Sequence, residues 1–199
     1  MQELFSYEKE KLTIDIINAN IIAIVLIIPC ILIFGLPFYL IWKNEIDFTY
    51  FSGKKIFSEI PFISLYIFVT MIAGIIIHEL IHGIVWAIYS NKGFKSIKIG
   101  ILWKLLTPYC HCSEPLKLRH YMAGAIAPSI ILGFLPSILA VITGSTGLLL
   151  FGIIFTVAAA GDFMILYILR NENKDDLVLD HPSEAGCYIF REKRHEKNC

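Results

Sequence analysis

Four apolar stretches run through this chain, and each is long enough to cross a lipid bilayer as a helix. They cover residues 20–42, 60–90, 118–142 and 148–170. A helix of about 20 apolar residues spans the hydrocarbon core of a membrane. Hydrophobic residues make up 56% of the sequence and charged residues only 17%, whereas about 25% of the residues of a soluble domain are charged. We therefore expect an integral membrane protein whose core, residues 20–170, crosses the bilayer with these four helices.

The connection between the second and third stretches has a different period. Within residues 94–113, Ile97, Ile99 and Ile101 alternate with polar or small residues. A period of two is typical of a β-strand, and the residues that follow can return as its partner. We therefore predict an all-α membrane protein with four transmembrane helices and a small β-hairpin between the second and third helices. This hairpin is either an ordinary surface feature or an edge that binds an extended polypeptide by strand addition.

The polar parts of the chain carry most of its positive charge. Of the 17 lysines and arginines, 14 lie in residues 1–19, in residues 91–119 and from Arg170 onward. Positively charged loops stay in the cytoplasm. We therefore expect a multi-pass protein of a prokaryotic cell membrane, with the N-terminal segment 1–19 and the tail 171–199 both cytoplasmic. Acidic and basic residues are equal in number, at 17 each, which argues against a nucleic-acid partner.

The second apolar stretch contains an H-E-x-x-H motif, formed by His78, Glu79 and His82. Histidines four positions apart lie on the same face of a helix, so both imidazoles can bind one zinc ion while the glutamate lies beside the reacting water. Ionisable groups are costly in hydrocarbon, and those found there usually have a function. We interpret His78 and His82 as zinc ligands and Glu79 as the catalytic base of a metalloprotease. The alternative is a polar patch satisfied by neighbouring helices.

Asp162 is the only formal charge in the fourth stretch before Arg170. Zinc held by two histidines needs a third protein ligand, and in catalytic sites this ligand is often a carboxylate. His82 lies eight residues before Ser90, where the second helix is expected to end, and Asp162 lies eight residues before Arg170. Both side chains should therefore lie at the same depth, about 12 Å from one membrane face. We predict that Asp162 completes the zinc site; otherwise it is a helix-packing aspartate.

Other potential zinc ligands lie outside the apolar stretches. Cys110-His111-Cys112 combines thiols with an imidazole, but in a strand the two cysteines face away from the histidine. Asp180 and His181 lie in a stretch that is typical of a turn. The five cysteines are odd in number and form no C-x-x-C pair, which argues against a disulfide framework. If Asp162 is not the third ligand, the candidates are His111, Glu114, His120 and the tail.

The order of these features resembles that of site-2 proteases, the intramembrane zinc metalloproteases. The resemblance covers about Phe62 to Arg170 and comprises the motif helix, the strands, the small-residue stretch Gly124 to Ser129 and the helix that bears Asp162. The chain looks still more like the small membrane proteins called putative zincin peptidases. The aspartate stands here in Ala160-Gly161-Asp162-Phe163, whereas site-2 proteases usually have Asn-Pro-Asp-Gly.

The resemblance implies a zinc cofactor (Zn²⁺) bound by His78, His82 and Asp162, with Glu79 as the catalytic base. It implies cleavage of peptide bonds in membrane-embedded or membrane-adjacent polypeptides. The expected substrate-binding residues are those of the hairpin edge and of the small-residue stretch: Ile99, Ile101, Gly124 and Pro128. Two alternatives remain open, a non-catalytic membrane protein that binds a metal and a pseudo-protease that binds transmembrane helices without cutting them. The sequence specifies no oligomeric state.

Overall fold

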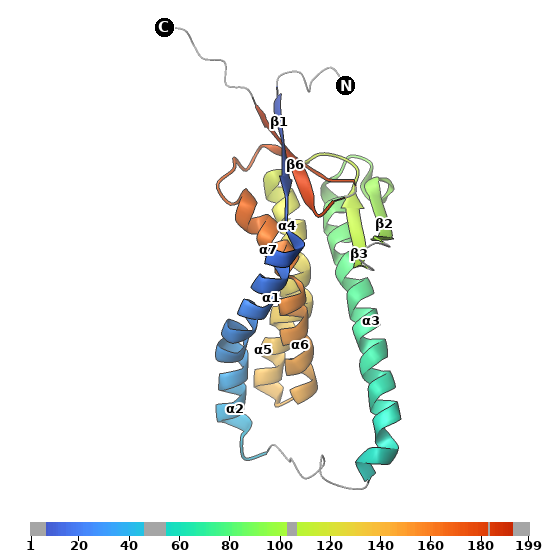
Figure 1. The fold of residues 1–199 in the computed structure, drawn as a ribbon, viewed down its shortest axis with the longest axis vertical. Coiled ribbons are helices and arrows are strands. Elements are labelled where there is room, and N and C mark those ends of the chain that lie inside the picture. Colours follow the sequence, from blue (N-terminus) through green and yellow to red (C-terminus); the bar gives the residue numbers. More distant parts are fainter. Residues whose placement is uncertain (1–6, 46–54, 103–106, 183, 193–199) are drawn as a thin grey trace.

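The apolar stretches form a bundle of long helices, which a computed structural model describes together with the strands for residues 7–45, 55–102, 107–182 and 184–192 (Figure 1). Three helical segments of these ranges are long and apolar enough to cross a membrane: Ile17–Trp42, Ile60–Tyr89 and Leu118–Thr143. A fourth crossing is formed if a bent pair of helices, Thr146–Ala158 and Ala160–Leu169, counts as one span. These findings are consistent with a multi-pass membrane protein.

The first and third spans contain a π-helical segment. The first span consists of α1 (Ile16–Cys30), η2 (Ile31–Gly35) and α2 (Leu36–Trp42), and the third of α4 (Leu118–Pro128), η5 (Ser129–Phe134) and α5 (Leu135–Thr143). Pro29 lies just before η2 and Pro128 just before η5. Proline lacks the N–H that an α-helix needs, and a π-helical turn accommodates this irregularity. The rings of Phe34 and Phe134, one from each segment, lie 6.1 Å apart.

The second span, α3 (Lys55–Tyr89), is one continuous helix, but the fourth apolar stretch is broken. The sequence predicted a single helix over 148–170, and the structure divides it into α6 (Thr146–Ala158) and α7 (Ala160–Leu169), which are bent by 45°. The break lies at Ala159, whose ψ of 13° departs from the helical value. As a consequence, Asp162 lies in the first turn of α7, where the positive end of the helix dipole favours a carboxylate.

The expected all-α class is too narrow, because the chain also forms a four-stranded antiparallel sheet. Its strands are arranged in the order β1 (Tyr7–Thr13), β6 (Gly186–Glu192), β5 (Leu177–Asp180) and β4 (Leu116–Lys117). The sheet joins the N-terminal segment to the tail, with Tyr7 paired to Glu192 and Thr13 paired to Gly186. It lies at one end of the helical bundle (Figure 1). The sequence does not predict this pairing of the segment 1–19 with the tail 171–199, because strands so far apart in the chain leave no local pattern that would indicate their partners.

The predicted hairpin is present as β2 (Ile97–Leu102) and β3 (Thr107–Cys112), which follow the short η4 (Gly93–Ser96). It lies close to α3 at Gly83, where an added Cβ atom would be 3.0 Å from Ile97 and 3.1 Å from the sulfur of Cys110. A larger residue at this position would push the hairpin away from α3. The hairpin therefore sits beside the helix that carries the H-E-x-x-H motif.

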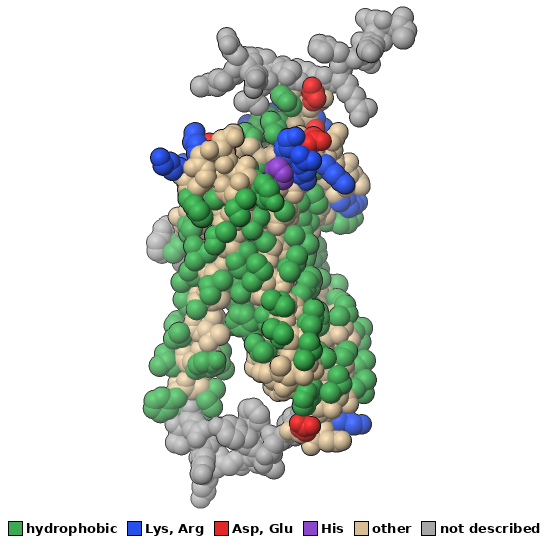
Figure 2. Space-filling view, turned by 180° about the vertical axis from the view of Figure 1, so that it is seen from behind, with side chains coloured by type: hydrophobic (Ala, Val, Ile, Leu, Met, Phe, Trp, Pro, Cys, Tyr) green, Lys and Arg blue, Asp and Glu red, His purple; other side chains and the backbone are tan. Residues whose placement is uncertain are grey.

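The surface separates into an apolar belt and a charged end. Figure 2 shows hydrophobic side chains along the whole length of the bundle, with most of the visible lysines and arginines at the end that carries the sheet in Figure 1 and a smaller charged group at the opposite end. Large apolar side chains on α3 such as Phe62 and Tyr66 are 74% and 72% exposed. A surface of this kind is stable in lipid and costly in water. The buried core under the sheet includes Tyr121, Leu169 and Ile189, so the sheet packs directly on α4 and α7.

Candidate metal centre

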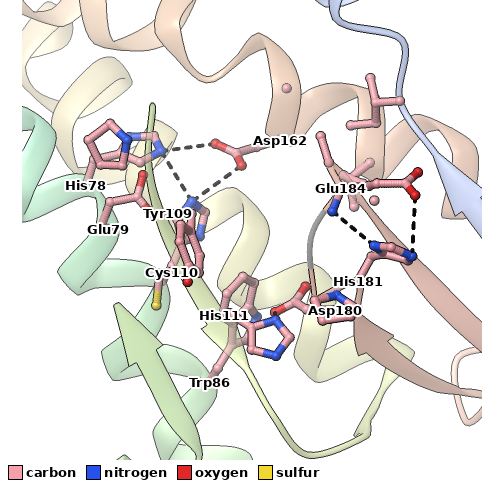
Figure 3. A pocket seen from close by; sticks show the side chains of 18 of the residues that line it. His78, Glu79, Trp86, Tyr109, Cys110, His111, Asp162, Asp180, His181 and Glu184 are labelled. Atoms are coloured by element: carbon pink, nitrogen blue, oxygen red, sulfur yellow. Dashed lines mark hydrogen bonds and ion pairs between the residues drawn. The ribbon is translucent and has the colours of Figure 1, made fainter. Parts of the chain in front are cut away.

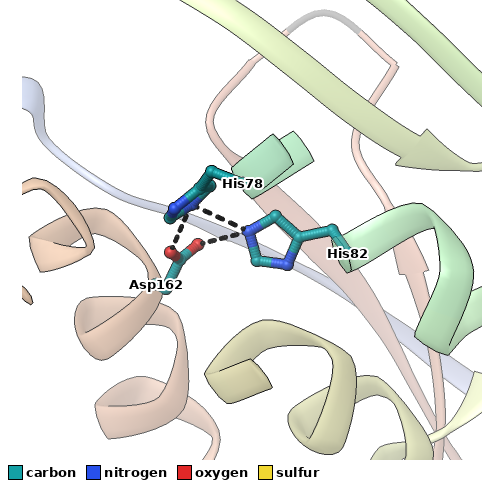
Figure 4. A group of neighbouring side chains, drawn as sticks. All are labelled: His78, His82 and Asp162. Atoms are coloured by element: carbon teal, nitrogen blue, oxygen red, sulfur yellow. Dashed lines mark hydrogen bonds and ion pairs between the residues drawn. The ribbon is translucent and has the colours of Figure 1, made fainter. Parts of the chain in front are cut away.

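Helix α3 brings the two histidines of the motif together. The Nε2 atoms of His78 and His82 lie 3.2 Å apart, and their rings are nearly perpendicular, at 77°. The motif lies within a continuous helix, so the spacing of four residues places one imidazole about one turn beyond the other. Both Nε2 atoms therefore point to the same spot (Figure 4).

Asp162 of α7 reaches the same spot from the opposite side. Its Oδ2 lies 3.2 Å from His78 Nε2 and its Oδ1 lies 3.4 Å from His82 Nε2. In the described residues, these three side chains form the one group of three or more potential ligands that could hold a metal ion. A tetrahedral zinc ion with bonds of about 2.0–2.1 Å separates its ligand atoms by about 3.3 Å. The observed distances fit that geometry, so the residues are suited to zinc.

The backbone of α4 holds His82 in this orientation. The Nδ1 atom of His82 lies 2.8 Å from the carbonyl oxygen of Gly124. On the other side, the ring of Trp86 stacks on His82 with a centroid distance of 5.1 Å, and its indole N–H donates to the carbonyl of Tyr121. Zinc-binding histidines commonly donate their second ring N–H to a carbonyl or carboxylate. His82 has this arrangement.

A cavity of about 290 Å³ lies beside the three side chains. Glu79 lines it, and the backbone of Cys110 is hydrogen-bonded to the Glu79 carboxylate. The side chain of Asp162 is 23% exposed, so the metal group is open to the cavity. The remaining walls come from β3, α7 and the tail, and their polar or aromatic residues include Tyr109, His111, Asp180, His181 and Glu184 (Figure 3).

None of the four expected substrate-binding residues lines this cavity. Ile99 and Ile101 lie on β2 and do not line the cavity, whereas residues 108–111 of β3 do. Pro128 is fully buried, and Gly124 bonds His82 through its carbonyl. The strand of the hairpin that faces the metal group is therefore β3.

Cys110, Cys112 and His111 do not join the metal group. Cys110 and His111 line the cavity but lie outside the group that could hold a metal. Burial raises the pKa of Cys110 to about 12, so this thiol stays protonated at neutral pH. Burial also lowers the pKa of His111, so its imidazole is neutral there.

The tail contributes residues to the site that its sequence does not single out. Asp180 and His181 are expected only as alternative ligands, and no motif indicates Glu184. Their turn between β5 and β6 forms a wall of the cavity. The run Cys187-Tyr188-Ile189-Phe190 is rich in strand-forming residues, and this signal could have indicated that the tail folds back as a strand.

Comparison with known proteins gives one family. Residues 71–177 match the family model described as "Putative zincin peptidase", and this range includes the motif, the hairpin and Asp162. No curated protein and no solved structure matches the chain.

Proposed function

Because this chain belongs to the putative zincin peptidase family, we propose that it is a zinc metallopeptidase of the site-2 protease type. His78, His82 and Asp162 hold the zinc ion, and Glu79 is the catalytic base. The observation that carries this proposal is the set of separations of 3.2, 3.2 and 3.4 Å between the three ligand side chains. Glu79 opens into the same cavity.

Peptide-bond hydrolysis needs a base beside the metal ion and a cavity that admits the peptide. When bound, zinc polarises the substrate carbonyl and lowers the pKa of water to about 7. The Glu79 carboxylate takes the proton of the attacking water and gives it to the leaving amide nitrogen. The stacked rings of His82 and Trp86 and the Gly124 carbonyl keep the His82 imidazole in place during these steps.

The substrates are polypeptides within or next to the membrane. His78 and His82 lie in a span, and Asp162 lies in the bent pair of helices, which supports a site inside the bilayer. The three side chains line one cavity with residues of β3 and α7, and these two elements lie toward the end of the bundle that carries the sheet (Figure 1). That end faces the cytoplasm by the distribution of lysine and arginine, so water reaches the cavity from the cytoplasm.

Zinc analysis and cleavage assays on the same preparations test this proposal. Wild type, Glu79→Gln, His78→Ala and Asp162→Ala are purified in detergent, their zinc content is measured, and each is reconstituted with a library of single-span polypeptides. Glu114→Gln is the control, since this carboxylate pairs with Lys92 and does not line the cavity. We expect Glu79→Gln to keep one zinc ion per chain and to lose cleavage by about 10²–10⁴-fold. The two alanine variants should lose zinc.

Two results would overturn the proposal. One is a Glu79→Gln variant that cleaves as fast as wild type and Glu114→Gln. The other is a wild type that takes up no zinc even when it is purified in the presence of the metal.

A further inference from the structure

Asp180, the last residue of β5, is a buried carboxylate outside the metal group. It is 8% exposed and lies beyond the residues that match the family. The hydroxyl of Tyr121 donates to its Oδ1 at 2.6 Å, and the backbone N–H of Cys112 donates to its Oδ2 at 2.8 Å. A buried carboxyl oxygen that loses such a partner is costly to leave unsatisfied. The Asp180 side chain of the tail is therefore hydrogen-bonded both to α4 and to the end of β3.

The bond to Tyr121 continues toward the metal ligands. The ring of Tyr121 stacks on Trp86 with a centroid distance of 5.3 Å and an angle of 9°. Trp86 in turn stacks on His82 at 5.1 Å and 15°. We refer to His82, Trp86 and Tyr121 as the ring column. Asp180 bonds the end of this column that lies farthest from the metal group.

The bond to Cys112 holds the strand that lines the cavity. Residues 108–111 of β3 line the cavity beside the metal group, and Cys112 is the last residue of this strand. Its side chain is 1% exposed. The sulfur donates to the carbonyl of Glu114, so the backbone turns away directly after the contact with Asp180. The contact therefore determines how the end of β3 lies relative to α4.

We propose that Asp180 is a positioning residue, which holds β3 and the ring column so that an extended polypeptide lies correctly between β3 and the β5–β6 turn. The part of this inference that concerns substrate rests on the peptidase function proposed above. The part that concerns β3 does not. In this arrangement the tail forms part of the binding site for the polypeptide.

The first test measures how firmly β3 is held, and it needs no enzymatic activity. A full-length variant keeps Cys112 as its one cysteine, with Cys30, Cys110, Cys187 and Cys199 replaced by serine. The rate at which a maleimide labels Cys112 is measured with Asp180→Ala, Tyr121→Phe and Glu172→Gln added singly. We expect Asp180→Ala to raise the rate by roughly tenfold or more, because local opening exposes the thiol. Tyr121→Phe should give a smaller increase.

Glu172→Gln is the matched control for damage to the tail. Glu172 accepts two hydrogen bonds from Arg191 of β6, both 2.7 Å long. This variant weakens the packing of the tail without touching β3. The proposal is overturned if Glu172→Gln raises the labelling rate as much as Asp180→Ala. It is also overturned if Asp180→Ala and Tyr121→Phe both label at the rate of their parent.

The second test separates positioning from loss of folded protein. If Asp180 aligns the substrate, Asp180→Ala and Tyr121→Phe should raise KM for a polypeptide by about tenfold, with a smaller change in kcat and unchanged zinc content. Partial unfolding would instead lower kcat at constant KM, because fewer chains would be active. An unchanged KM in both variants overturns the role in substrate alignment. If either of the two results given above overturns the proposed function, the labelling test still decides whether Asp180 holds β3.

Discussion

His82 and Gly124 are joined by a hydrogen bond of 2.8 Å between the imidazole Nδ1 and the backbone carbonyl oxygen. A carbonyl oxygen can only accept, so Nδ1 carries the proton and Nε2 keeps its lone pair. This Nε2 is the atom that lies 3.2 Å from His78 and 3.4 Å from Asp162. Helix α4 thus selects the form of His82 that is able to bind a metal, although α4 supplies no metal ligand itself.

The close approach at Gly124 leads to the first prediction. A Cβ atom at this position would lie 2.0 Å from Nε1 of Trp86, so Gly124→Ala must displace the ring that stacks on His82. Loss of such a supporting contact lowers metal affinity by about 10–100-fold. We expect a decrease of this size when zinc is titrated against a competing chelator. Gly147→Ala is the control, since no atom lies within 4 Å of the added Cβ, and equal affinities in the two variants would contradict the prediction.

The second prediction concerns the cysteine beside the cavity. The pKa of Cys110 is raised to about 12, chiefly by burial, and zinc binds the thiolate form of cysteine. Cys110→Ser should therefore retain the zinc content of wild type, whereas His82→Ala should lose it. Metal analysis of the two purified variants checks this. Loss of zinc in Cys110→Ser would contradict the prediction and would indicate that Cys110 of β3 is a metal ligand.

The third prediction concerns the pH dependence of the sheet. Hydrogen bonds from Arg191 hold the pKa of Glu172 below its usual value of 4.5. Because the folded pKa is the lower one, this pair stabilises the fold above about pH 4.5, and the stabilisation is lost as pH falls through the folded pKa. Glu172→Gln should lower the thermal midpoint at pH 7, by an amount that corresponds to about 1 kcal/mol or less for a partly exposed pair. The difference should shrink as the pH falls below 4.5.

Thermal unfolding of both proteins at several pH values measures this effect. Glu8→Gln, an exposed position of β1, controls for the loss of one negative charge. If the difference in thermal midpoint between wild type and Glu172→Gln grows as the pH falls, the predicted direction of the pH dependence is wrong.

The fourth prediction concerns orientation in the membrane. Tyr7 pairs with Glu192 in the sheet, so we expect the two ends of the described chain to lie on the same side of the bilayer. We propose that this side is the cytoplasm, because lysine and arginine gather there (Figure 2). Fluorescent-protein fusions at either end should be fluorescent, and alkaline phosphatase fusions at the same ends should be inactive. A phosphatase inserted after Gly147 should be active, and the reverse pattern would place the sheet outside the cell.

The metal group could be predicted because its signals are local. The spacing of His78 and His82 defines one face of a helix, and counting residues to the helix ends gave Asp162 a matching depth. The structure places the three side chains together. The break at Ala159 could not be predicted in the same way, because alanine favours a helix and the stretch Ala158 to Gly161 contains no proline.

The walls of the cavity could not be predicted, because they depend on contacts between distant parts of the chain. Alternating residues indicate a hairpin but not which of its strands faces the metal. The structure shows that β3 lines the cavity, although residues of both strands, Ile97 and Cys110, lie close to α3 at Gly83. The contact between Asp180 and Tyr121 likewise joins residues 59 positions apart, and a turn-like sequence at Asp180 gives no indication of its partner.

The pairing of Tyr7 with Glu192 also determines when, during synthesis, the four-stranded sheet can be completed. β1 is synthesised long before β6 and has no partner in the sheet until β6 has been made, and contacts of such long sequence separation form late. The turn that precedes β6 lines the cavity. A nascent chain that already contains all three metal ligands therefore still has an open cavity, which closes only after translation has passed β6.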